Sequence, residues 1–217
     1  MPAWTSSVTT DRLLKPLTAL LAALPLAWLG YAIAHDRGAA GGLLGADPGE
    51  AVVHFLGQWG LRLLLATLAV SSVRHRLHWP PVMRVRRLLG LFAFTYLALH
   101  LLAYLWFLLG FEWNQIGEDL AKRPYITVGA LALLLLLPLA VTSTRGWQRR
   151  LRRNWQRLHR LIYPAAALGL LHLFWLTKDG YAEPLVYLVV LTLLLLERLQ
   201  RALQRSSGRS RANAGQA

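Results

Sequence analysis

The chain has 217 residues, 55% of them hydrophobic, and yet its formal net charge is +14. Soluble domains rarely combine so apolar a composition with so much charge, whereas a membrane protein with several spans does so when the charge lies in its loops. The sequence contains no cysteine, which excludes disulfides, thiolate metal sites, iron–sulfur clusters and covalent c-type haem attachment.

Basic and acidic residues alternate along the chain. Nineteen of the 24 lysines and arginines fall in four segments, at residues 12–15, 74–87, 145–160 and 198–211. Eight of the ten acidic residues fall between them, at residues 36–50, 112–119 and 179–183. The positive-inside rule places the basic segments in the cytoplasm, so we expect cytoplasmic termini and an even number of spans. The charge therefore indicates membrane topology and not nucleic-acid binding.

The first predicted span covers residues 17–34 and follows a polar stub at residues 1–16. No small-residue cleavage site follows it, so we expect a transmembrane helix and not a cleaved signal peptide. The second span covers residues 54–73 and contains Arg62, roughly 12 Å along the helix from its start. Arg62 either extends to the lipid headgroups or faces inward as the counter-ion of an anionic group such as a haem propionate.

The third predicted span begins after Arg86 and Arg87. This pair either anchors the helix at the cytoplasmic surface or binds a propionate or a flavin phosphate, and the sequence leaves both readings open. The fourth span covers residues 125–141, and the fifth crosses the stretch at residues 155–178. The core of the sixth covers residues 185–196.

Two histidines lie at the same predicted depth. His100 and His172 each follow the inner end of an outward-running span by about twelve residues, or roughly 18 Å along the helix. Facing imidazoles at one level can supply both axial ligands of a b-type haem. The alternative is that each histidine only hydrogen-bonds a backbone carbonyl, because an intramembrane imidazole needs some partner.

His159 precedes His172 by thirteen residues, roughly 20 Å along a helix. Three readings of His159 stay open: ligand of a second, inner haem; hydrogen-bond partner of a flavin or quinone; or interfacial histidine without a ligand. The third span has Arg87, not a histidine, thirteen residues before His100. A second bis-histidine haem therefore lacks its partner ligand.

These elements predict an all-α membrane bundle of six transmembrane helices over residues 17–199. A basic cytoplasmic tail follows at residues 200–217, and we expect it to be disordered past about Ser206. No soluble domain, internal repeat, P-loop or GxGxxG motif is recognisable, so nothing predicts NAD(P)H binding.

Six stretches in the same order over residues 45–178 carry a resemblance. They read GADPGEAVVHFLGQWGLRLLLATLAVS, RRLLGLFAFTYLALHLLAY, KRPYITVG, LAVTSTRG, WQRLHRLIY and LHLFW. The sequence thereby resembles the MsrQ (YedZ) family, within the ferric-reductase-like transmembrane group. The resemblance implies a b-type cytochrome of the bacterial inner membrane that takes electrons from the quinone pool, with FMN also associated with the family. It further implies a periplasmic molybdenum-containing partner that reduces methionine sulfoxide in proteins.

By position, His100 and His172 match the membrane histidines of that family, and His159 matches its W-x-x-L-H histidine. Arg62 and Arg87 are further candidate cofactor-binding residues. The chain would then be an electron-transfer subunit without a substrate-reducing site of its own. Two alternatives are a ferric-chelate reductase and a haem-free transporter or assembly factor.

Overall fold

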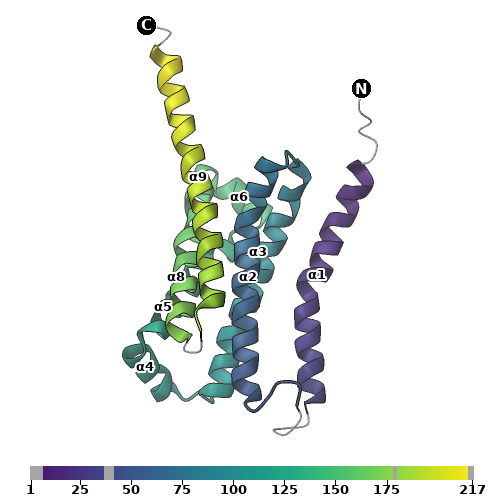
Figure 1. The fold of residues 1–217 in the computed structure, drawn as a ribbon, viewed down its shortest axis with the longest axis vertical. Helices are drawn as coiled ribbons and strands as arrows, with labels where there is room; N and C mark the ends of the chain where they lie inside the picture. Colours follow the sequence, from purple (N-terminus) through teal and green to yellow (C-terminus); the bar gives the residue numbers. More distant parts are fainter. Residues whose placement is uncertain (1–6, 37–41, 178–179, 215–217) are drawn as a thin grey trace.

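A computed structural model describes residues 7–36, 42–177 and 180–214 of the chain. Within these ranges the structure consists of helices and the turns between them, which confirms the all-α prediction. Six longer helices run up and down along the long axis of the molecule (Figure 1). They are α1 (Ser7–His35), α2 (Pro48–Arg76), α3 (Met83–Ala103), α5 (Pro124–Val141), α8 (Ile162–Leu176) and α9 (Ala182–Ala214).

Shorter helices connect the long ones. They are η2 (Pro80–Val82), η3 (Tyr104–Leu108), α4 (Trp113–Lys122), α6 (Arg145–Leu151), α7 (Arg153–Leu158) and η4 (His159–Leu161). The π-helical turn η3 extends α3 directly. Helix α4 occupies the segment between the third and fourth predicted spans, which the sequence interpretation treated only as an external loop.

Among the residues that the structure describes, four segments are long and apolar enough to cross a membrane, by length and composition. They are Leu13–His35, Pro48–Arg76, Pro80–Leu108 and Pro124–Val141. They match the first four predicted spans. Helices α8 and α9 are not among them, so the count of six stays a prediction. Both helices nevertheless pack in the bundle, α8 against α5 and α9 against α2 and α8.

Local sequence signals set where the long helices begin. The carboxylate of Asp47 accepts a hydrogen bond from the Glu50 backbone N–H at 2.9 Å, and Pro48 occupies the first turn of α2. Pro124 opens α5 in the same way. A side-chain cap and an initial proline both suit the start of a helix, where backbone N–H groups lack partners.

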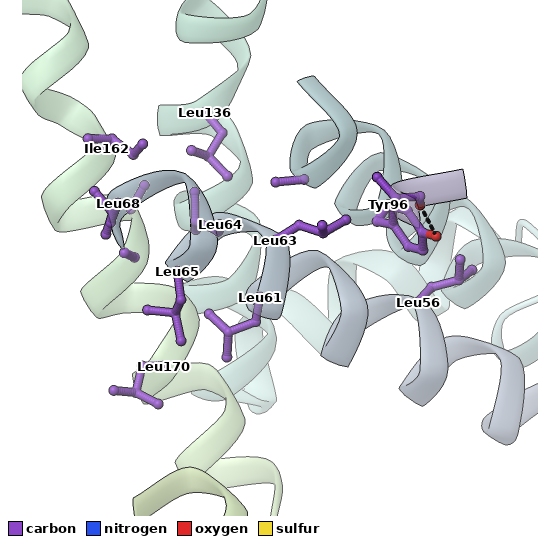
Figure 2. Close-up of a cluster of buried hydrophobic side chains, with 14 of the residues drawn as sticks. Leu56, Leu61, Leu63, Leu64, Leu65, Leu68, Tyr96, Leu136, Ile162 and Leu170 are labelled. Carbon is purple, nitrogen blue, oxygen red and sulfur yellow. Dashed lines mark hydrogen bonds between the residues drawn. The ribbon is translucent and has the colours of Figure 1, made fainter. Parts of the chain in front are cut away.

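Helix α2 lies at the centre of the apolar core. Its residues Leu61, Leu65 and Leu68 are buried next to Ile162 and Leu170 of α8 (Figure 2). Helix α2 also packs along α3 and against α9. A central helix of this kind is apolar on several faces, unlike a helix that only borders a core.

A buried tyrosine on α3 joins helix α1 to the bundle through two hydrogen bonds. The hydroxyl of Tyr96, on α3, donates to the carbonyl of Ala22 at 2.8 Å and accepts from the N–H of Leu26 at 3.1 Å. Tyr96 is 0% exposed. These two backbone groups are normally partners in the i→i−4 ladder of a helix, so the tyrosine inserts into that ladder beside Pro25.

The beginning of α1 and the end of α9 lie at the same end of the molecule (Figure 1). An even number of crossings requires this arrangement. The structure continues α9 to Ala214, past Ser206, where the sequence predicts that order ends. The first six residues of the predicted stub and the last three of the predicted tail lie outside the described residues.

Candidate functional site

The two histidines predicted at one depth do face each other. His100 on α3 and His172 on α8 have ring centres 6.2 Å apart, and the ring planes are inclined at 78°. Both residues are half-buried. The structure therefore brings together the imidazoles of two residues that are 72 positions apart in sequence, as the matched depths predict.

Each imidazole is also held by a backbone carbonyl on a neighbouring helix. Nδ1 of His100 lies 2.8 Å from the carbonyl oxygen of Val53, on α2. Nδ1 of His172 lies 2.7 Å from the carbonyl oxygen of Tyr125, on α5. Since a carbonyl can only accept, Nδ1 carries the hydrogen in both rings. Nε2 is thus the nitrogen left to bind a metal, and the carbonyl alternative of the sequence interpretation is realised together with the facing pair.

The spacing of the two rings fits one haem iron. A metal–imidazole bond measures about 2 Å and each ring centre lies about 1 Å beyond its nitrogen, so a bis-histidine iron sets the centres about 6 Å apart. The observed separation is 6.2 Å. Neutral imidazoles with defined tautomers are also the usual axial donors of b-type haem. The residues present therefore fit the group.

Two glycines beside this pair were missed by the sequence interpretation. A Cβ on Gly57 would lie 2.9 Å from Nδ1 of His100, and a Cβ on Gly129 would lie 2.8 Å from Nδ1 of His172. Both distances are too short for carbon and nitrogen that are not bonded or hydrogen-bonded to each other. The only available signal was the sequence separation of glycine and histidine, which is the same in both cases.

His159 lies in a different setting, on η4. Its ring stacks on that of Trp155, with centres 4.0 Å apart, and its Nε2 lies 3.2 Å from the hydroxyl of Thr142. That hydroxyl donates to the carbonyl of Pro138 at 2.6 Å, so it accepts from Nε2. Nδ1 is therefore the nitrogen of His159 left for a ligand, and the aromatic ring that stacks on His159 belongs to a tryptophan and not to a second histidine.

Arg62 is tied to α9. Its guanidinium donates to Glu183 at 2.7 Å and to the hydroxyl of Tyr187 at 2.7 Å, and it lies 5.2 Å from the centre of the Trp59 ring. Gln58 donates to the second carboxylate oxygen of Glu183 at 3.1 Å. These contacts favour a structural role. The propionate role of Arg62 stays a prediction that they do not support.

Arg87 is exposed at the start of α3. The structure does not place it with the histidine pair, because His100 lies thirteen residues further along α3 and His172 lies on α8. Its cofactor-binding role stays a prediction. No group of three or more histidine, cysteine, aspartate or glutamate side chains suited to a metal ion occurs in the described ranges.

Comparisons with known proteins agree with this architecture. Residues 56–170 match the family model described as "Ferric reductase like transmembrane component". That match includes His100 and His159 and ends two residues before His172.

Several curated relatives share one name, "Protein-methionine-sulfoxide reductase heme-binding subunit MsrQ". One from Xanthomonas campestris is 50% identical over 179 residues, 82% of each chain. One from Caulobacter vibrioides is 47% identical over 190 residues, 87% of this chain and 88% of the relative. One from Xanthomonas oryzae is 45% identical over 200 residues, 92% of each chain. The chain belongs to the MsrQ family, within the ferric-reductase-like transmembrane group.

Proposed function

We propose that this chain is a b-type cytochrome of the bacterial inner membrane that carries electrons to a protein-methionine-sulfoxide reductase. The observation that carries the proposal is the pair His100 and His172, with ring centres 6.2 Å apart and Nδ1 of each ring held by a carbonyl. The name shared by the relatives, which describes a heme-binding subunit of that reductase system, supports the same conclusion.

The haem supplies one-electron redox chemistry when it is bound. The side chains position it and do not react. The two histidines would hold the haem through Nε2, and the carbonyls of Val53 and Tyr125 fix the tautomer and plane of each ring. The surrounding helices are apolar, which keeps water away from the site and lowers its polarity. The chain then needs no catalytic residue of its own.

Six spans with both termini in the cytoplasm form part of this proposal. Helix α8 follows η4 without a break, and the helical path from His159 to Leu176 crosses the bundle beside α5. Helix α9 returns along α2 to the end where α1 begins (Figure 1). With the basic segments inside, the histidine pair lies in the outer half of the membrane, on the periplasmic side.

The electron source and acceptor come from the family resemblance. We propose that quinol supplies the electrons and that a periplasmic molybdenum-containing subunit receives them. FMN is a further proposed cofactor. A second haem at His159 is not favoured, because this ring stacks on Trp155 and not against a histidine.

Optical spectra with a haem count test the proposal. We would purify the protein after haem-supplemented expression and compare wild type, His100→Ala, His172→Ala and His159→Ala. His75→Ala is the matched control, because His75 is an exposed histidine in the last turn of α2. We expect reduced b-type bands in wild type, in the control and in His159→Ala, and their loss in the His100 and His172 variants.

A colourless wild type would overturn the cytochrome proposal and favour a haem-free transporter or assembly factor. Loss of half the haem in His159→Ala would instead establish a second site. The electron acceptor distinguishes a subunit of the methionine-sulfoxide reductase from a ferric-chelate reductase. In proteoliposomes, we expect the quinol-reduced protein to be reoxidised by the periplasmic subunit and not by a ferric chelate.

A further inference from the structure

We propose that Gly57 and Gly129 are matched positioning residues that set the orientation of His100 and His172, and thereby the redox potential of the site. Each glycine leaves room for a histidine ring to cross the face of a neighbouring helix and reach a carbonyl of that helix. The inference rests on the proposed haem function.

The first half of the arrangement joins α2 and α3. Val53 and Gly57 are four residues apart on α2, so they lie one above the other on the same face of the helix. His100 donates to the Val53 carbonyl at 2.8 Å. A Cβ on Gly57 would lie 2.9 Å from Nδ1 of His100 and 3.0 Å from Cε1. The ring therefore lies directly over the bare Cα of the glycine.

The second half repeats the first between α5 and α8. Tyr125 and Gly129 are four residues apart on α5, and His172 donates to the Tyr125 carbonyl at 2.7 Å. A Cβ on Gly129 would lie 2.8 Å from Nδ1 and 3.0 Å from Cε1 of His172. In both halves 47 residues separate the carbonyl from its histidine. The pairs α2–α3 and α5–α8 thus contain the same arrangement of a carbonyl, a glycine four residues later and a histidine on the facing helix.

The carbonyl and the glycine act together. In an α-helix the carbonyl of residue i accepts from the N–H of residue i+4, so Val53 and Tyr125 already face the N–H groups of Gly57 and Gly129. A carbonyl oxygen has two lone pairs, and the histidine uses the second one. To reach it, the ring must pass over the i+4 position, where any side chain would block it.

The hydrogen bond has a chemical consequence for a bound metal. Donation from Nδ1 to a carbonyl fixes the ring plane and makes Nε2 a stronger donor, which stabilises the oxidised metal and lowers its potential. An alanine at either glycine would push the ring away and lengthen this bond. The potential should then rise, and the angle of 78° between the ring planes should change.

Gly57→Ala and Gly129→Ala test the proposal, and the chain offers three controls. A Cβ on Gly90, on α3, or on Gly169, on α8, would make only ordinary contacts of 3.5 and 3.8 Å. A Cβ on Gly60 would lie 2.6 Å from the side chain of Leu97, so Gly60→Ala damages the packing of α2 and α3 without touching a histidine.

The readouts are haem per chain, the midpoint potential and the electron paramagnetic resonance of the oxidised protein. Steeply inclined imidazole planes give a strongly anisotropic low-spin signal, and we expect this signal in wild type, Gly90→Ala and Gly169→Ala. The two test variants should show a changed principal g value and a raised potential, or should lose haem. An unchanged g value and potential in both variants would overturn the proposal, as would the same changes in Gly60→Ala.

A double-mutant cycle, measured on protein without haem, tests the proposal even if the test variants lose haem or fold poorly. Gly57→Ala should lower the melting temperature in the wild-type background and not in His100→Ala, because the clash needs the ring. An equal loss in both backgrounds would mean that the glycine only packs helices, and would overturn the proposal. A wild type without haem would overturn the proposed function instead, and this cycle would still report on the glycine.

Discussion

The ion pair of Arg62 and Glu183 should stabilise the fold without holding the haem. It joins the middle of α2 to the start of α9, and Gln58 and Tyr187 complete the cluster. Removing either charge would leave the other without its partner. We therefore expect Arg62→Gln and Glu183→Gln each to lower stability, and the double variant to lose less than the sum.

The geometry sets the expected size of this coupling. The closest nitrogen and oxygen are 2.7 Å apart, and the two side chains are 38% and 37% exposed. At about 4 Å between charge centres and an effective dielectric constant of about 20, the attraction is about 4 kcal/mol. Desolvation offsets much of it, and hydrogen-bond couplings in membrane proteins average about 0.6 and reach about 1.7 kcal/mol. We expect a coupling of about 1–2 kcal/mol.

Reversible unfolding in mixed micelles would measure the four proteins of the cycle, with haem content recorded for each. Additive losses, within about 0.5 kcal/mol, would refute the pairing as a source of stability. If Arg62→Gln lost haem while Glu183→Gln kept it, the arginine would instead serve the cofactor, as the propionate reading predicts.

Three further changes have defined outcomes. Tyr96→Phe should lower the free energy of unfolding by about 1–2 kcal/mol and leave the haem spectrum unchanged, because it removes only the two hydrogen bonds to α1; chemical unfolding with optical detection would show this. Arg198→Gln should loosen α9, since Arg198 donates to the Tyr163 hydroxyl and to the Leu68 carbonyl; faster proteolysis of the last part of the chain would reveal it. Asp119→Ala should free α4, because the Asp119 carboxylate accepts from the Tyr104 hydroxyl on η3 and also pairs with Arg123; faster amide exchange confined to α4 would confirm these contacts.

The histidine pair could be predicted because depth in a membrane depends only on counting along a helix. His100 and His172 each follow a group of basic residues at the inner end of a span by a similar number of residues. Because every α-helix rises by the same amount per residue, the two histidines reach the same depth. Apolar runs and charge alternation likewise gave the first four spans, because both follow from what a bilayer tolerates.

Contacts between distant helices could not be predicted in this way. Glu183 is 121 residues from Arg62, and nothing in either segment indicates which faces of α2 and α9 meet. The roles of Gly57 and Gly129 depend on which helix lies opposite, and a glycine in an apolar run otherwise indicates close packing at most. Helix α4 was missed because its ten residues are polar on one side and lie between two spans, where a loop is the usual expectation.

The insertion of Tyr96 into α1 has a consequence for how the protein is made. Helix α1 leaves the ribosome before α3, yet the group that bridges its backbone at Ala22 and Leu26 belongs to α3. Much of the surface of α1 is exposed in the folded chain, and before α3 enters the membrane the contact of α1 with the bundle is limited to α2, where the Trp28 ring stacks on that of Phe55. The two hydrogen bonds that join α1 to Tyr96 therefore form only after α3 has been synthesised. Until then the Ala22 carbonyl and the Leu26 N–H can pair with each other within α1.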